Sequence, residues 1–194
     1  MKVKNCLGDT FQYDCQQLMK QIQTMYQPDV VVAIRSGGLV VAQQMLKTQG
    51  GAEPLLIDVL AQRPNTKHKN SIKLDKILAY LPSWLCDFLR IMEMQYAIKR
   101  FNRHDFSKRD VIIEERYQTD IKMAQRILVI DDAVDSGITL MSVLELIKQL
   151  SPHAEIKSAA LTVTFPAPLV EPDFLLYRHV LLRFPWAADA KGRT

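Results

Sequence analysis

One thirteen-residue segment, Ile127 to Thr139, carries side chains suited to a charged ligand rich in hydroxyl groups. Its first four residues are aliphatic and predict a strand buried on both faces, and two adjacent carboxylates, Asp131 and Asp132, follow directly. These carboxylates suit diol hydroxyls or a hydrated divalent cation. Residues Ser136 to Thr139 then begin a predicted helix, whose free amides and hydroxyls suit a phosphate monoester. Together these groups describe a site for a phosphorylated ribose.

A second loop with anion-binding character follows an upstream aliphatic run, Val30 to Ile34. The loop consists of Arg35, Ser36, Gly37 and Gly38. Glycines let backbone amides approach an anion closely, the start of the following helix adds its positive end, and the arginine adds a charge. On its own this pattern also fits an ordinary turn between a strand and a helix. Its place upstream of the acidic segment favours an anion site.

The elements that must position these loops form an alternating pattern of strands and helices. Two strand-turn-helix units are predicted, and such alternation indicates a mainly parallel α/β sheet with its site at the carboxyl ends of the strands. The predicted strands are Val30 to Ile34, Pro54 to Leu60, Val111 to Ile113, Ile127 to Ile130, Ile156 to Val163 and Phe174 to Leu182. The predicted helices are Gln12 to Met25, Leu39 to Leu46, Ser71 to Leu81, Ser83 to Arg100 and Ile138 to Leu150.

Length and composition exclude several classes of protein. The 194 residues fit one domain with a remainder, and a net charge of +4, from 25 basic and 21 acidic residues, is too small to indicate nucleic-acid binding. Three cysteines, Cys6, Cys15 and Cys86, are odd in number and lack metal-ligand spacing, so a disulfide scaffold is excluded. The first fourteen residues have no apolar run of the kind found in a secretory signal. We therefore expect a cytoplasmic protein with reduced thiols.

Two stretches in the middle of the chain have alternative explanations. The apolar stretch from Ile77 to Tyr96 contains Pro82 and three charged residues, so it does not fit a bilayer span, and no membrane partner is expected. The basic run from Lys99 to Arg109 lacks interleaved aromatic residues and a recognition helix, so no nucleic-acid partner is expected.

The Ile127 to Thr139 segment closely resembles the phosphoribosyl-pyrophosphate (PRPP) signature of the type I phosphoribosyltransferases. The one departure is Ala133, at a position that is usually larger and aliphatic. The resemblance implies that Asp131 and Asp132 contact the ribose hydroxyls, with Mg²⁺ as the cofactor held through water or PRPP. It implies that Asp135 is the catalytic acid or base for the proton of the base. The residues implied to wrap the 5′-phosphate are Asp135, Ser136, Gly137, Ile138 and Thr139.

The upstream loop is similar to the segment that binds pyrophosphate in the same family. The match runs from Pro28 to Leu39, and the order of Arg35 and Ser36 departs from the commoner arrangement in that family. The resemblance therefore implies that Arg35, Ser36, Gly37 and Gly38 bind pyrophosphate. It also implies a homodimer, because dimers are usual in this family.

The C-terminal part of the chain resembles the ending of purine phosphoribosyltransferases of the hypoxanthine, guanine and xanthine group. Three positions depart from that pattern: Phe165 replaces the lysine that reads the 6-oxo group, Leu181 stands near the stacking tryptophan, and Ala187 replaces an acid. An unpaired base carbonyl in a buried pocket costs roughly 1–3 kcal/mol. The candidate base-pocket residues are Phe165, Phe184 and Trp186.

These resemblances imply a Rossmann-like parallel sheet of the type I phosphoribosyltransferase fold, with a small hood and a helical insertion. We expect a single domain, 1–194, with hood elements at 1–27 and 165–194 and an insertion at 74–109 where the family keeps a mobile lid. The expected activity transfers 5-phosphoribosyl from PRPP to a purine-like base. The alternative is a non-catalytic PRPP sensor on the same fold. Nine basic residues are candidates to neutralise pyrophosphate, although each alone is more often a solvated surface charge: Lys67, His68, Lys69, Lys99, Arg100, Arg103, His104, Lys108 and Arg109.

Overall fold

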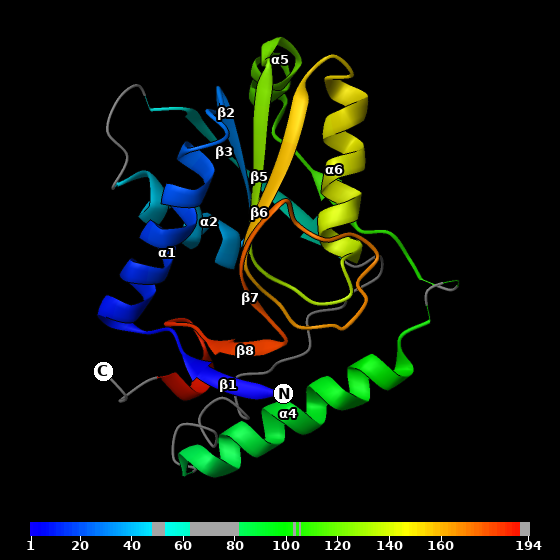
Figure 1. Cartoon of the computed structure of the whole chain (residues 1–194). Helices are drawn as coiled ribbons and strands as arrows, with labels where there is room; N and C mark the ends of the chain where they lie inside the picture. The colour runs from blue at the N-terminus through cyan, green and yellow to red at the C-terminus, as the bar shows by residue number, and fades with distance from the viewer. Residues whose placement is uncertain (48–52, 63–81, 103, 105, 191–194) are drawn as a thin grey trace.

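Six strands form the central sheet of this computed structural model, which describes residues 1–47, 53–62, 82–102, 104 and 106–190. The strands are β2 (Val30–Ile34), β3 (Leu55–Gln62), β4 (Asp110–Ile112), β5 (Arg126–Val134), β6 (Glu155–Val163) and β7 (Phe174–Arg178). Their order is β4-β3-β2-β5-β6-β7 (Figure 1). Only β4 is antiparallel to its neighbour, while β2, β3, β5, β6 and β7 pair in parallel.

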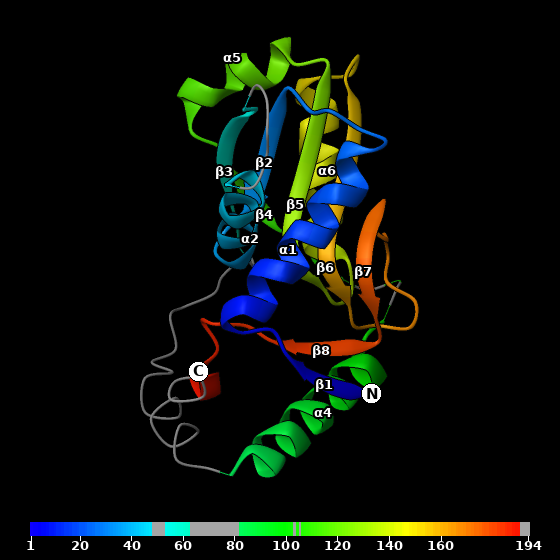
Figure 2. The same ribbon diagram turned by 60° about the vertical axis from the view of Figure 1, so that its left-hand side comes forward.

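Two hydrophobic cores lie on opposite faces of this sheet. Successive residues of a strand point to opposite faces, and accordingly Val31 and Leu128 belong to one core while Val30 and Ile127 belong to the other. The first core is covered by α1 (Gly8–Gln23) and α2 (Gly37–Leu46), and the second by α5 (Glu115–Met123) and α6 (Ile138–Leu150). Figure 2 shows the sheet between these helices. The aliphatic runs of β2 and β5 are therefore buried on both faces.

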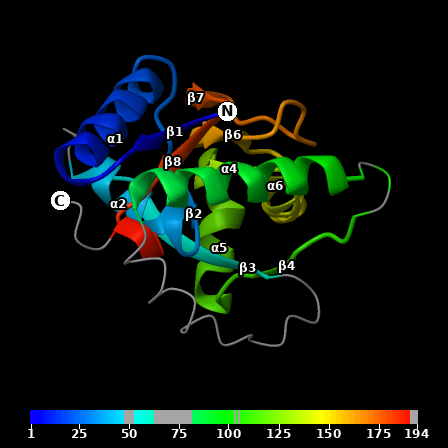
Figure 3. The ribbon, with the colours of Figure 1, turned by 90° about the horizontal axis from the view of Figure 1, so that it is seen from below.

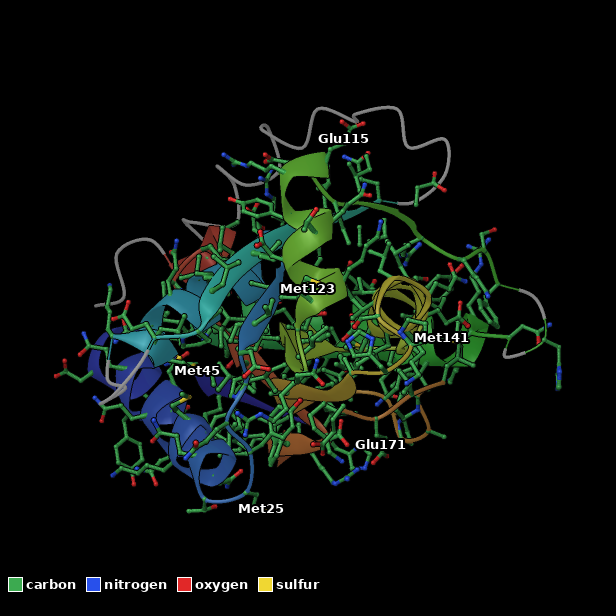
Figure 4. The ribbon with its side chains drawn as sticks, turned by 90° about the horizontal axis from the view of Figure 1, so that it is seen from above. Met25, Met45, Glu115, Met123, Met141 and Glu171 are labelled. Atoms are coloured by element: carbon green, nitrogen blue, oxygen red, sulfur yellow. The ribbon has the colours of Figure 1, made fainter. Side chains whose placement is uncertain are left out.

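The parallel strands run in one direction, so their carboxyl ends meet at one end of the sheet and their starts at the other. Figure 4 looks down on α5, with Glu115 and Met123 labelled, at the end where β5 begins. The carboxyl ends of β2, β5 and β6 point the opposite way, toward the lower part of Figure 1.

Most predicted elements are present, and the bounds of α6 and of the helix from Ser83 to Arg100 are confirmed. The first helix begins at Gly8, earlier than the predicted Gln12. Strand β5 continues past the predicted end at Ile130 to Val134. The acidic pair, Asp131 and Asp132, therefore lies within the strand and not after it. Strand β1 (Lys2–Asn5) and helix α5 were not predicted. The helix predicted at Ser71 to Leu81 lies outside the described residues.

The predicted strand from Phe174 to Leu182 is wrong, because the chain turns at His179 and forms two strands in different sheets. His179 has a φ of 57°, a left-handed conformation that ends β7. The next strand, β8 (Val180–Arg183), pairs in parallel with β1 in a separate two-stranded sheet. Of the segments predicted as hood, 2–5 and 180–183 form this small sheet, whereas α1 and β7 belong to the main layers.

Helix α4 (Ser83–Arg100) lies beside the small sheet and across the lower end of the molecule (Figure 3). Its only buried side chain is that of Cys86. Large apolar side chains on its outer face, including Trp84, Phe88 and Met92, are each more than half exposed. The apolar spacing therefore predicts the helix correctly, but apolar burial is not what holds it in place.

A buried arginine holds α4 instead. Arg183 on β8 is only 2% exposed, and its Nε lies 2.9 Å from a carboxylate oxygen of Asp189, which is 3% exposed. The same guanidinium also donates to Asn5 on β1 and to Asp87 on α4. Arg90, one turn further along α4, donates to Asp189 as well. This Arg183 cluster joins both strands of the small sheet to α4.

A second charged cluster joins the small sheet to the main layers. Asp14 on α1 is 1% exposed and accepts hydrogen bonds from Lys4 of β1 at 3.0 Å and from the Tyr177 hydroxyl of β7 at 2.7 Å. Because unpaired buried charges are costly, this contact fixes β1 against α1 and β7.

Two remaining expectations concern the thiols and membranes. All three cysteines are free and buried. Within the described part of the chain, no helix combines the length and the apolar character needed to cross a membrane.

We expect Arg183→Met to lower the free energy of unfolding by about 3–5 kcal/mol, because it leaves the buried Asp189 carboxylate with one fewer cation. The matched control is Arg178→Met, which removes a solvent-exposed pair with Glu171 and is expected to cost about 1 kcal/mol or less. Urea denaturation measures both. Equal losses in the two variants would show that the Arg183 cluster does not hold the fold.

Candidate active site

The parallel pairing of β2 with β5 brings the two predicted loops together. Val30 lies opposite Ile127 and Ala33 opposite Ile130, so the two strands run in register toward the same edge. Arg35 to Gly38 follow β2 at that edge, and Asp131 and Asp132 occupy the last part of β5. The two motifs, almost 100 residues apart in sequence, therefore become neighbours.

The close approach of the two loops depends on two glycines. A Cβ added at Gly37 would overlap with the carboxyl group of Asp132, and one added at Gly38 would lie 2.6 Å from the carbonyl oxygen of Ile130. These positions therefore leave no room for a side chain. The glycines allow the first loop to sit directly against the acidic end of β5.

The acidic pair is held in a poorly hydrated environment. Asp131 is 8% exposed, and its Oδ1 accepts a hydrogen bond of 2.9 Å from the amide of Asp132. Burial raises the pKa of Asp131 well above its usual range, and the neighbouring charge of Asp132 adds to the rise. Burial also raises the pKa of Asp132. The pair therefore favours binding of a cation or of hydroxyl donors, either of which stabilises the charged carboxylates.

This donor set fits Mg²⁺ better than a metal held entirely by protein. In the described ranges, no three His, Cys, Asp or Glu side chains gather as a metal-binding group. Mg²⁺ is commonly held by one or two carboxylates together with water and substrate phosphates. Asp131 and Asp132 provide that number of carboxylates.

Asp135 directly follows β5 and lines the cavity, and a hydrogen bond from the residue after β6 holds its side chain. The hydroxyl of Thr164 donates a 2.5 Å hydrogen bond to Asp135 Oδ1. The surrounding protein raises the pKa of Asp135 by desolvation, the hydrogen bond from Thr164 opposes the rise, and the negative charge of Glu93 on α4 adds to it. Asp135 is therefore oriented and made more basic than an ordinary aspartate.

The loop after Asp135 is shaped to bind an anion at the start of α6. Gly137 has a φ of 81°, a left-handed conformation, and a Cβ there would lie 2.9 Å from the backbone of Val170. The Leu169 amide donates to the Ser136 carbonyl at 2.8 Å. This contact fixes the loop while the first amides of α6 remain available to a ligand.

Arg35 is engaged by acidic neighbours. Its guanidinium pairs with Asp58 on β3 and lies 3.8 Å from Glu114, and its side chain is 45% exposed. The peptide bond between Arg35 and Ser36 is cis. An anion at this loop would therefore compete with two carboxylates for Arg35.

A cavity of about 710 Å³ lies against this edge of the sheet. One wall is formed by Asp131 and by residues 133–140, which include the whole predicted phosphate loop. Other lining residues come from the C-terminal half of α4 and the segment that follows it, and they include Glu93, Tyr96, Phe101 and Arg109. Helix α4 therefore completes the candidate site.

The predicted base-pocket residues lie in two different places. Phe165 lines the cavity, and the edge of Phe101 packs on it with ring centroids 5.5 Å apart. Phe184 and Trp186 stack on each other at 4.8 Å, and Trp186 also contacts Phe11 at 5.7 Å, in the region under α1. The cavity wall does not include these two rings, nor does it include Asp132 or the Arg35 to Gly38 loop.

Two residues that were not predicted as site residues, Thr164 and Glu93, lie near Asp135. Thr164 directly follows β6, and the parallel pairing of β5 with β6 brings it to Asp135. Glu93 lies on α4, whose placement depends on the Arg183 cluster. Neither residue belongs to a local motif.

The amino-acid sequence matches the model of the phosphoribosyl transferase domain family over residues 85–189, just over half of the chain. The chain belongs to this family. A comparison with curated protein sequences finds no match.

Solved structures of phosphoribosyltransferases share the fold across nearly the whole chain. A purine phosphoribosyltransferase from Pyrococcus horikoshii is 21% identical with a TM-score of 0.61, covering 96% of this chain and 94% of that chain. A xanthine-guanine-hypoxanthine phosphoribosyltransferase from Helicobacter pylori is 18% identical with a TM-score of 0.61, covering 97% and 96%. A hypothetical protein from Neisseria gonorrhoeae with bound ppGpp is 15% identical with a TM-score of 0.58, covering 96% and 90%. These similarities confirm the predicted type I phosphoribosyltransferase fold.

We expect Asp131→Asn to stabilise the free protein while abolishing binding of Mg²⁺ and PRPP. The raised pKa means that the charged carboxylate costs folding free energy above that pKa, and asparagine removes the charge but keeps the acceptor for the Asp132 amide. Each 1 kcal/mol recovered raises Tm by roughly 2–4 °C in a chain of this size. Thermal denaturation and calorimetry at neutral pH measure the two effects.

The control for this experiment is Asp120→Asn on α5, an exposed carboxylate at the opposite end of the sheet, which should change neither property. In the wild type, binding of Mg²⁺ and PRPP should strengthen as pH rises through the raised pKa of Asp131 and then level off. An asparagine variant that binds PRPP like the wild type would contradict the assignment.

We expect Gly37→Ala to weaken PRPP binding about tenfold or more, because the new methyl group displaces the Asp132 carboxylate. A double-mutant cycle tests this cause. In an Asp132→Ala background the overlap is relieved, so the Gly37 substitution should add little further loss. Additive losses, measured by calorimetry, would show that the two residues act independently.

Proposed function

We propose that the protein is a phosphoribosyltransferase that moves 5-phosphoribosyl from PRPP to a ring nitrogen of a purine-like base and releases pyrophosphate. The family and fold support a transferase that uses PRPP. The observation that carries the specific proposal is that Asp131, the phosphate loop and Asp135 line one cavity of about 710 Å³, with Asp132 next to Asp131 in β5. We further propose that the enzyme acts in the cytoplasm as a homodimer.

In this proposal each group has a distinct role. Asp131 and Asp132 accept hydrogen bonds from the ribose hydroxyls, residues 136–139 hold the 5′-phosphate, and residues 35–38 hold the pyrophosphate. Mg²⁺ held by the acidic pair would offset the negative charge of the leaving group. The bond between C1 of the ribose and pyrophosphate breaks, and the base nitrogen forms the new bond to C1.

Asp135 is the proposed proton acceptor for the incoming base. Its carboxylate faces the cavity, and the Thr164 hydroxyl holds it in one orientation. Because Asp135 must be ionised to accept a proton, its raised pKa predicts that kcat/KM for the base increases with pH on the acidic side and then levels off.

In this proposal the cavity residues near Asp135 select the base, and they differ from those of a site that binds the 6-oxo group of a purine. Phe165 offers no hydrogen-bond donor, and Phe101 packs against it. The charged side chain that acts on Asp135 is the acidic Glu93. These neighbours favour an acceptor that presents N–H donors and an apolar ring face over one that presents a buried carbonyl.

A second candidate function is a PRPP sensor without turnover. The observation that favours it is again Phe165, because the residue needed to read a 6-oxopurine is missing while the PRPP-binding groups are present. Asp135 would then have no proton to accept.

The test measures PRPP binding and pyrophosphate release with a panel of amino- and oxo-substituted purines and pyrimidines. We expect release with at least one base, and we expect Asp135→Asn to lower kcat about 100-fold or more while PRPP still binds. The control is Asp173→Asn. The Asp173 carboxylate accepts hydrogen bonds from the amide and hydroxyl of Ser158 and does not line the cavity. Tight PRPP binding without release for any base would support the sensor, and absence of PRPP binding would refute both functions.

A further inference from the structure

Arg109 lies beside Thr139, the last residue of the phosphate loop, although it belongs to none of the recognised motifs. It precedes β4 at the edge of the sheet, and its amide donates to the Ser142 hydroxyl at 3.0 Å. That hydroxyl in turn donates to the carbonyl of Ile138 at 2.8 Å, within the first turn of α6. The backbone of Arg109 is therefore fixed against the helix whose N-terminus faces the cavity.

The side chain of Arg109 extends along the same loop. Its Nε lies 3.4 Å from the hydroxyl oxygen of Thr139, and the half-buried residue lines the same cavity as Ser136 and Gly137. A guanidinium is a planar fork of N–H donors, and this geometry suits two oxygens of one phosphate group.

A phosphate bound at residues 136–139 would need a nearby positive charge, because the cavity wall carries acidic side chains. The loop itself offers neutral amides and hydroxyls, whereas Asp131, Asp135 and Glu93 give the cavity wall negative charge. A phosphate monoester carries close to two negative charges at neutral pH. Among the described residues, Arg100 also lines the cavity, but it is exposed at the end of α4, and its guanidinium lies 3.3 Å from the Tyr96 hydroxyl on the same helix.

We propose that Arg109 binds the 5′-phosphate of the ribose, together with the amides and hydroxyls of residues 136–139. This inference rests on the proposed use of PRPP. It assigns Arg109 to the phosphate that stays on the product and not to the pyrophosphate, for which the sequence made it a candidate. The segment before β4 thus contributes a binding residue to a loop that in sequence lies about thirty residues later.

The neighbouring Lys108 provides a matched control. Its ammonium group lies 2.6 Å from a carboxylate oxygen of Glu145 on α6, and its side chain is 60% exposed. Lys108→Ala therefore removes one positive charge from the same segment without removing a group that faces the phosphate loop.

The experiment measures by calorimetry how the wild type, Arg109→Gln, Arg109→Lys and Lys108→Ala bind three probes in the presence of Mg²⁺. The probes are PRPP, ribose 5-phosphate and inorganic pyrophosphate. We expect Arg109→Gln to weaken PRPP and ribose 5-phosphate by a similar factor, about 10- to 100-fold, and to change the Kd of pyrophosphate less than twofold. Arg109→Lys should recover part of the loss because it keeps the charge, and Lys108→Ala should match the wild type.

Each other outcome counts against the inference in a distinguishable way. Unchanged binding of ribose 5-phosphate by Arg109→Gln, with PRPP bound by the wild type, overturns the role of Arg109 and leaves the proposed function intact. Equal weakening of pyrophosphate and ribose 5-phosphate assigns Arg109 to a general charge effect and also overturns it. Failure of the wild type to bind PRPP refutes the proposed function itself. The glutamine keeps an N–H donor for Thr139, and thermal denaturation of each variant confirms that the fold is retained.

Discussion

The candidate site depends on the parallel register between β2 and β5. Because these strands end at the same edge, the glycine loop after β2 and the acidic end of β5 must share one small volume. Gly37 and Gly38 make that sharing possible, since any side chain there would overlap with Asp132 or with the backbone of Ile130. A shift of one residue in this pairing would turn every side chain of β5 to the other face and separate the two loops.

Placing three carboxylates near the end of β5 costs folding free energy, because their negative charges repel one another. Asp131, Asp132 and Asp135 are close together, Asp131 is buried whereas Asp135 is exposed, and the pKa of each is raised. In the free protein these charges oppose folding, and a cationic or hydroxyl-bearing ligand relieves that opposition. The large aliphatic cores on both faces of the sheet supply the stability that permits it.

The second wall of the cavity has a different physical origin. Helix α4 buries little apolar surface, and its position is determined by Asp87 and Arg90, which pair with Arg183 and Asp189. This placement brings Glu93 and Phe101 to the wall of the cavity that Asp135 and Phe165 also line. Helix α4 therefore contributes to the cavity through an ion-pair cluster and not through apolar packing.

The sequence alone determined the α/β class, the helix from Ser83 to Arg100, and the positions of the glycine loop after β2 and of the acidic segment at the end of β5. Those features depend on local patterns: aliphatic runs, glycine pairs, adjacent acids and helical spacing, each within about fifteen residues. The tertiary structure alone decided the break at His179, the pairing of β1 with β8, the face of α4 that is exposed, and the contacts of Thr164, Glu93 and Arg109. Each of these depends on partners distant in sequence, such as Arg183 with Asp87 or Arg109 with Thr139. Local periodicity carries no information about which distant residue completes a buried ion pair or reaches a loop, so only the folded chain shows it.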